Sequence, residues 1–186
     1  MTCIVGIAYD GITTIAGDSA ATNGSSQQVI RADSKVFVVG ECIFGCGSSF
    51  RMIQLLRYSL RLPTYSDDSD IFEYMATAFI NAVRECLKQG GYAREENGRE
   101  EGGKFLVGLR GTLFTVESDY QIEEAMAGYN AVGSGDDIAL GALFATRNVG
   151  MGPAERLELA LQAASYHNSD TRPPFVFVST RGLHHR

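Results

Sequence analysis

The sequence has no apolar run long enough to cross a lipid bilayer, and no basic segment precedes its first apolar residues. The opening stretch MTCIVGIAYDG is interrupted by Asp10, so it predicts a first strand rather than a signal peptide. We therefore expect a cytoplasmic protein that does not insert into a membrane.

Positive charge is scarce as well. The chain carries 16 Lys and Arg residues against 22 Asp and Glu residues, a formal net charge of −6. No stripe of Lys and Arg is available to neutralise phosphates, and this argues against a nucleic-acid partner.

Patterns typical of metal sites and disulfides are also missing. The histidines all lie at or after His167, away from any cysteine pair with zinc-finger spacing. Cys42 and Cys46 fall on one face of a strand-like segment but are well separated along it. We expect no metal, no cofactor and no disulfide, and we expect the cysteines to be buried, reduced thiols: Cys3, Cys42, Cys46 and Cys86.

The overall composition is that of a globular protein. Of the 186 residues, 45% are hydrophobic and 20% are charged, values near the averages for folded domains. A chain of this length can bury a sizeable core. We expect one domain that covers residues 1–186, and not a disordered or fibrous chain.

Strands are predicted in pairs. The segment 2–9 is apolar on both faces, and Asp10-Gly11 is a strong signal for a two-residue turn before a return strand. Gly40-Glu41 marks a second hairpin, which follows a polar loop at 23–28. The strand segments are 2–9, 12–18, 35–39, 42–44, 104–111, 112–118, a short stretch ending at 131–133, and 175–180.

Helices are predicted in two groups. Ser48-Ser49 can cap the first helix, which Pro63 ends, and the acidic run 67–70 suits the N-terminus of the second. Two more are expected at 137–147 and 153–166, whereas residues 90–103 are Gly-rich and charged and favour a surface loop. Runs of strands separated from runs of helices indicate an α+β protein, here a four-layer αββα sandwich of two antiparallel sheets flanked by helix pairs.

Several segments together resemble the proteasome β-subunits and the bacterial HslV peptidase, members of the N-terminal nucleophile (Ntn) hydrolases. The opening from Thr2 to Thr22 has the family's apolar strand, hairpin and Ala-Gly-Asp-x-x-Ala-Thr segment in register. The further matching segments follow in the family's order: Ser34-Lys35-Val36-Phe37, Gly45-Cys46-Gly47-Ser48, and Ala131-Val132-Gly133-Ser134-Gly135.

The resemblance implies a threonine peptidase whose nucleophile is Thr2 after removal of Met1. A threonine hydroxyl needs a nearby base, and a free α-amino group with a pKa near 8 can serve. By resemblance, Lys35 places a cation beside this pair and Asp18 holds the lysine. Gly47 is expected to donate its backbone N–H to the oxyanion, and Ser134 is expected to hydrogen-bond the Thr2 amine.

The resemblance weakens in the segment 167–174. Proteasome subunits carry an Asp and a Ser followed by two glycines here, and Asp170 aligns with that Asp only if two residues are deleted. The position of the Ser then falls on Pro173. HslV-type enzymes also lack the Asp and use the corresponding turn to bind a cation through carbonyl oxygens. Asp170 is retained as a candidate catalytic residue, and His167 is expected at the surface.

Three residues are expected to contact substrate. Thr22 is carried over from the resemblance, and Gly45 corresponds to the floor of the pocket for the residue before the scissile bond. Asp33 lies two residues before Lys35 and, placed in the wall of that pocket, favours a basic or polar side chain.

The resemblance further implies a homo-oligomeric ring that acts on unfolded polypeptides, with an ATPase partner by analogy with HslV. Two alternatives stay open. One is a proteasome-like structural or assembly protein that has lost its activity, and the other is an amidase for small molecules, since this fold hosts several amide substrates.

Overall fold

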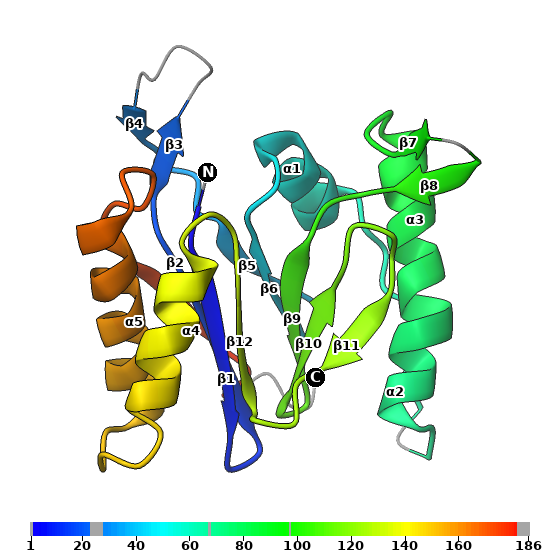
Figure 1. Ribbon diagram of the computed structural model, residues 1–186. Helices are drawn as coiled ribbons and strands as arrows, with labels where there is room; N and C mark the ends of the chain where they lie inside the picture. Colours follow the sequence, from blue (N-terminus) through cyan, green and yellow to red (C-terminus); the bar gives the residue numbers. More distant parts are fainter. Residues whose placement is uncertain (1, 23–27, 67, 97, 182–186) are drawn as a thin grey trace.

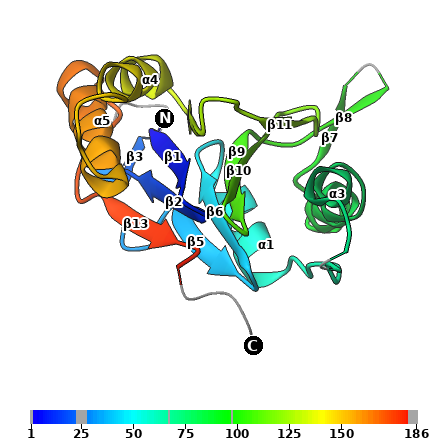
Figure 2. The same cartoon turned by 90° about the horizontal axis from the view of Figure 1, so that it is seen from below.

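Two antiparallel sheets lie face to face, and helices cover both outer faces (Figures 1 and 2). The computed structural model describes residues 2–22, 28–66, 68–96 and 98–181. The arrangement confirms the predicted α+β class and the four-layer αββα sandwich.

The first sheet has the strand order β12-β1-β2-β13, formed by Tyr129–Val132, Ile4–Tyr9, Ile12–Gly17 and Val176–Ser179. Asp10 and Gly11 join β1 to β2 with φ angles of 50° and 71°. Both residues are in the left-handed region, as a type I′ hairpin turn requires. The turn sets the register in which Tyr9 faces Ile12 and Ile4 faces Gly17.

The second sheet has the order β11-β10-β9-β6-β5. Its strands are Ile122–Glu124, Thr112–Val116, Phe105–Leu109, Cys42–Cys46 and Val36–Val39. Two short ribbons extend from this core: β3 (Ala20–Thr22) with β4 (Gln28–Ile30), and β7 (Arg94–Glu96) with β8 (Arg99–Glu101).

The helices form the outer layers. On the second sheet lie α1 (Phe50–Tyr58), α2 (Ile71–Tyr74), the π-helical turn η1 (Met75–Phe79) and α3 (Ile80–Gln89). On the first sheet lie α4 (Asp136–Ala145) and α5 (Pro153–His167). The side chains of Ser49 and Asp70 accept hydrogen bonds from the first turns of α1 and α2, which explains where these helices begin.

Three apolar clusters hold the layers together. Ile4, Ile15 and Ile43 belong to the cluster between the sheets, which is buried from both sides. A second cluster packs β1 and β2 against α4 and α5, and a third packs the other sheet against α1 and α3. Because β1 is covered on both faces, its side chains are apolar throughout.

Several details differ from the sequence-based expectations. The segment 90–103 was expected to be a surface loop, but it contains the β7–β8 ribbon. Its charged residues lie opposite one another on two antiparallel strands. The second helix contains the π turn η1, which helical periodicity does not reveal. Residues 23–27 of the predicted polar loop lie outside the described residues.

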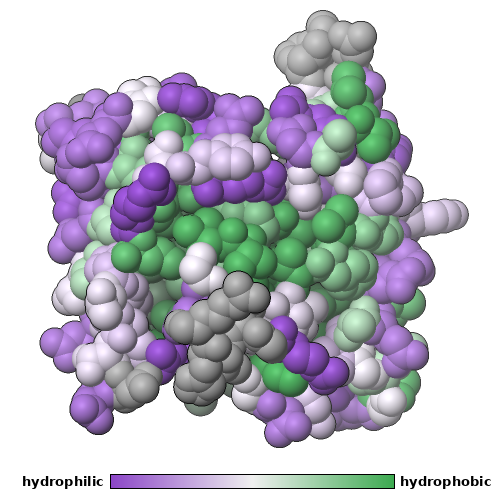
Figure 3. All heavy atoms as spheres, turned by 180° about the vertical axis from the view of Figure 1, so that it is seen from behind, coloured by the Kyte–Doolittle hydropathy of each residue, from purple (hydrophilic) through white to green (hydrophobic). Residues whose placement is uncertain are grey.

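The cysteine prediction is confirmed: all four cysteines are free and buried. None of the described helices has the length and apolar character needed to span a membrane. The rear of the molecule shows a band of apolar side chains (Figure 3). Among the exposed large apolar residues are Val38 of β5 and Phe177 of β13, both on edge strands of their sheets.

Candidate active site

Thr2 is buried at the entrance to β1, where the loop between β12 and α4 holds its backbone. The Thr2 N–H donates to Oγ of Ser134 at 3.2 Å, and the Gly135 N–H donates to the Thr2 carbonyl oxygen at 3.3 Å. Gly133 has a φ of 112°, and a Cβ atom there would lie 2.2 Å from the Thr2 carbonyl oxygen. Only glycine therefore allows this loop to approach Thr2 so closely.

Lys35 and Asp18 form a buried ion pair that is close to Thr2 in space although distant from it in sequence. Asp18 directly follows β2, Lys35 directly precedes β5, and Nζ of Lys35 donates to Oδ1 of Asp18 at 2.7 Å. The Asp18 carboxylate also accepts the N–H groups of Cys3 and Ala20, each at 3.0 Å. The carboxylate thus connects the start of β1, the end of β2 and the start of β5.

Burial lowers the pKa of Lys35 below its ordinary value, and the Asp18 carboxylate opposes this effect. A buried lysine that is paired with a carboxylate supplies a positive charge at a fixed position. Such a group can lower the proton affinity of a neighbouring hydroxyl or amine.

Gly47 lies beside the Thr2 side chain, where β6 leads into α1. A Cβ atom at Gly47 would lie 3.1 Å from Cγ2 of Thr2, so the missing side chain leaves the Gly47 backbone close to the hydroxyl-bearing carbon. This is the approach that a backbone oxyanion donor requires.

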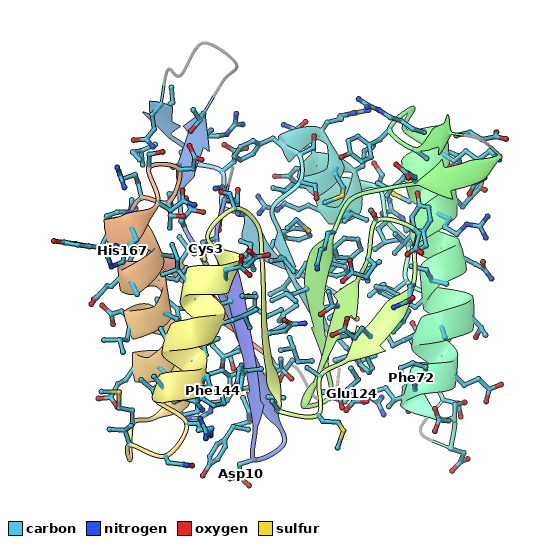
Figure 4. The ribbon with its side chains drawn as sticks, in the orientation of Figure 1. Cys3, Asp10, Phe72, Glu124, Phe144 and His167 are labelled. Atoms are coloured by element: carbon cyan, nitrogen blue, oxygen red, sulfur yellow. The ribbon has the colours of Figure 1, made fainter. Side chains whose placement is uncertain are left out.

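A cavity of about 410 Å³ lies next to the Thr2 side chain. Thr2, Lys35 and Gly47 line it together with Thr22 of β3, whose Oγ1 is buried and has no hydrogen-bond partner among the described residues. In Figure 4, Cys3 marks the end of β1 where these groups lie, and Asp10 marks the opposite end. The structure therefore brings together Thr2, Asp18, Lys35, Gly47, Ser134 and Thr22 at one end of the sandwich.

Asp170 reaches this site mainly through Asn168. The Asn168 side chain donates to the Ser134 carbonyl oxygen at 2.6 Å and accepts the Asp170 N–H at 2.8 Å. The negative charge of Asp170 also raises the pKa of Lys35, but less than Asp18 does. His167 is exposed at the end of α5 (Figure 4).

Gly45 and Asp33 do not line the cavity. A Cβ atom at Gly45 would lie 2.5 Å from Ile4 and Ile15, so Gly45 faces the space between the sheets, and its neighbour Cys46 lines the cavity instead. Asp33 is paired with Arg31, which does line the cavity. Of these two residues, the one that lies in the wall of the cavity is therefore Arg31.

Sequence reasoning missed two of these residues, Arg31 and Asn168. Arg31 lies two residues from Asp33, a spacing that permits a local ion pair, but neither residue lies in a recognisable motif. Asn168 is the C-cap residue of α5 and belongs to the polar segment after that helix. Helix ends often carry Asn, so its contact with Ser134 has no separate sequence signal.

Comparison with known proteins shows the fold. No model of a known protein family and no curated protein sequence matches the chain. BPH from Thiobacillus denitrificans, solved alone, is 22% identical with a TM-score of 0.77, over 96% of this chain and 97% of that chain. A second structure of BPH contains epoxomicin and has the same TM-score at 20% identity, with the same shares of both chains.

HslV from Trypanosoma brucei is 17% identical with a TM-score of 0.67, over 96% of this chain and 98% of that chain. The Anbu protein of Yersinia bercovieri, described as an ancestral beta-subunit, is 13% identical with a TM-score of 0.68, over 96% and 81%. The chain thus has the fold of the proteasome-β and HslV type of Ntn hydrolase, as the sequence resemblance implied.

Proposed function

We propose that the protein is a threonine peptidase subunit that uses Thr2 as its N-terminal nucleophile once Met1 has been removed. One observation carries the proposal: Thr2 lines the same cavity as Lys35, whose ammonium is held at 2.7 Å by the buried carboxylate of Asp18. A hydroxyl near a buried cation, with the backbone of a glycine close to its carbon atom, supplies the groups that acyl transfer needs.

The reaction begins when Oγ of Thr2 attacks the carbonyl carbon of a peptide bond. The free α-amine of Thr2 accepts the hydroxyl proton, and the Gly47 N–H donates to the negative oxygen that forms. Cleavage of the C–N bond then transfers the proton to the departing amine and leaves an ester on Thr2. A water molecule hydrolyses this ester, with the α-amine again acting as the base.

The neighbouring residues support this sequence of proton transfers. Lys35 lowers the proton affinity of the Thr2 hydroxyl and amine, and Asp18 fixes the ammonium in place. Ser134 orients the Thr2 nitrogen, to which it is already hydrogen-bonded. Asp170 adds negative charge beyond Lys35, and this effect raises the lysine's pKa.

The natural substrates in this proposal are unfolded polypeptides, cleaved inside a ring of identical subunits. Two features support association: the fold is that of ring-forming peptidases, and an apolar band lies across the rear face (Figure 3). Light scattering and native mass spectrometry of the purified protein test the ring, and a monomer in both measurements contradicts it. An ATPase partner is proposed by analogy only.

The test of the activity compares three proteins whose N-terminal residue has been verified by intact mass. Wild type should hydrolyse fluorogenic peptides, and Thr2→Ala should lose activity by at least about a thousandfold because the nucleophile is gone. Thr2→Ser keeps a hydroxyl and an α-amine, so it should retain measurable activity. Equal rates for wild type and Thr2→Ala contradict the proposal.

A fourth sample identifies the role of the free amine. Protein that retains Met1 has this amine in a peptide bond, so it should be inactive although its Thr2 hydroxyl is intact. If the protein from its native source also retains Met1, the structural or assembly role is favoured instead.

A further inference from the structure

The wall of the cavity carries a fixed positive group that the proposed chemistry does not use. Arg31 follows β4, and its backbone N–H donates to the Ser19 carbonyl oxygen at 2.9 Å. Its side chain lines the cavity that contains Thr2 and remains about one-third exposed. Arg31 can therefore meet a side chain of a bound peptide.

The Arg31 guanidinium is held on two sides. Asp33 accepts hydrogen bonds from Nε at 2.7 Å and from Nη2 at 2.6 Å, and the ring of Phe50 stacks on the guanidinium with its centroid 3.9 Å from Cζ. A guanidinium has five N–H donors, and Asp33 takes two of them, which leaves three for other acceptors. Because both contacts restrain the group, little further ordering is needed when a ligand binds.

The charge balance of the cavity favours an anion. Arg31 and Lys35 both line it, and no Asp or Glu is among the lining residues in the described part of the chain. The partner of Lys35, Asp18, is buried beneath it and accepts backbone N–H groups on its other sides. A basic side chain in this cavity would meet two cations. An acidic side chain would meet a guanidinium that gives two hydrogen bonds to Asp33 among the described residues and has further N–H donors.

The remaining walls suit the methylene groups of such a side chain. Val29, Phe50 and Ile53 contribute apolar surface to the same cavity. Apolar walls also strengthen a charge-assisted hydrogen bond, because they reduce the access of water.

We propose that this cavity selects peptides with an acidic residue, Glu or Asp, on the N-terminal side of the scissile bond, and that Arg31 is the residue that recognises the carboxylate. The inference deepens the proposed function and relies on it for the placement of the peptide. It replaces the preference for basic or polar side chains that Asp33 implied from the sequence.

The test measures binding, so that it does not depend on hydrolysis. Acetylated tripeptides that differ only in their C-terminal residue place that residue in the cavity, and all carry the same terminal carboxylate. Their dissociation constants are measured by calorimetry on the Thr2→Ala protein, with Glu, the uncharged isostere Gln, Lys and Leu at the C-terminus. We expect the Glu peptide to bind about tenfold more tightly than the Gln peptide, and the Lys peptide to bind most weakly.

Two substitutions of Arg31 identify the group responsible. Arg31→Met keeps much of the length but loses the charge, so the Glu and Gln peptides should bind with equal affinity while the Leu peptide binds within about twofold of its former affinity. Arg31→Glu should reverse the order of the Glu and Lys peptides. The Leu peptide also reports whether each variant keeps its cavity.

The outcomes separate this inference from the proposed function. Equal binding of the Glu and Gln peptides to the parent protein overturns the inference, as does a preference that survives in Arg31→Met. Hydrolysis of fluorogenic peptides by the protein with Thr2 intact is measured alongside. Selective binding of the Glu peptide without hydrolysis supports the acidic cavity and contradicts the peptidase.

Discussion

Asp18 and Lys35 meet at 2.7 Å in a part of the molecule where their side chains are 0% and 2% exposed. Removing two charges from water is costly unless their remaining hydrogen-bonding capacity is also used. Asp18 meets this condition with the N–H groups of Cys3, Ala20 and Arg172. The ion pair and its hydrogen bonds therefore depend on four chain segments that the fold brings together, at Cys3, at 18–20, at Lys35 and at Arg172.

Asp18→Asn should therefore damage both stability and activity. The substitution leaves the Lys35 ammonium buried without its anionic partner, which costs about 3–5 kcal/mol in the free energy of unfolding. Because Asp18 opposes the effect of burial, the pKa of Lys35 should fall further. Urea denaturation and peptide hydrolysis measure the two effects.

The matched control removes the charge from the partly exposed pair between Lys104 and Glu117. Glu117→Gln should change the free energy of unfolding by less than about 1 kcal/mol, since solvent screens this pair. If Asp18→Asn changes the free energy of unfolding as little as Glu117→Gln does, the ion pair of Asp18 and Lys35 does not stabilise the site.

Gly133→Ala should inactivate the protein by moving Thr2. The new Cβ would lie 2.2 Å from the Thr2 carbonyl oxygen, and the φ of 112° is unfavourable for alanine. Gly141 in α4 is the matched control, because a Cβ there meets nothing within 4 Å. Gly141→Ala should keep full activity and raise stability by up to about 1 kcal/mol. Full activity of Gly133→Ala, measured with fluorogenic peptides, contradicts the placement of this loop.

Asn168→Ala should lower kcat about tenfold and leave KM nearly unchanged. The substitution removes the hydrogen bond to the Ser134 carbonyl oxygen, so Ser134 is held less firmly against the Thr2 nitrogen. The neighbouring residue Ser169 is exposed, and Ser169→Ala should leave both constants unchanged. An unaltered kcat for Asn168→Ala shows that Ser134 needs no support from this side.

Stability should decrease as the pH rises above 9. Burial raises the pKa of Cys3 and Cys42 from 9.0 to about 12, so unfolded thiols lose protons that folded ones retain. Each thiol therefore stabilises the folded state fully below pH 9, and this contribution falls by about 1.4 kcal/mol per pH unit between pH 9 and 12.

The contribution of Lys35 to the pH dependence of stability has the opposite sign. Because its pKa is lowered in the folded state, this contribution increases the free energy of unfolding as the pH approaches 10.5. Urea denaturation between pH 8 and 11 measures the net slope. Cys42→Ala removes one thiol and should make the decrease shallower. An unfolding free energy that stays constant over this range is incompatible with buried, protonated thiols.

Local patterns in the sequence account for the layers of the fold. The turn at Asp10-Gly11 and the apolar strands beside it can be recognised in the sequence. A tight hairpin turn requires residues such as Asp and Gly, and a strand buried on both faces requires apolar residues throughout. The caps at Ser49 and Asp70 are visible for the same reason. The π turn at Met75–Phe79 is not, since its residues fit an ordinary helix equally well.

The site could be predicted only where it belongs to a recognisable motif. Thr2, Lys35 and Ser134 lie in segments whose residue types are distinctive. In the structure Thr2 and Lys35 line one cavity, and Ser134 accepts the Thr2 N–H. Asn168 was missed because its role depends on a contact with residue 134, which is far away in sequence. Whether Thr2 acts as a nucleophile stays a prediction.

The sequence by itself determined where the longer strands and the helices form, because the period of apolar residues and the residues at turns and caps are local properties. Only the tertiary structure decided which charged group faces the cavity. Arg31 and Asp33 are two residues apart, and the sequence-based expectation placed Asp33 in the wall. The stacking of Phe50 on the Arg31 guanidinium places Arg31 at the cavity, and this contact forms only when the end of β4 and the start of α1 come together.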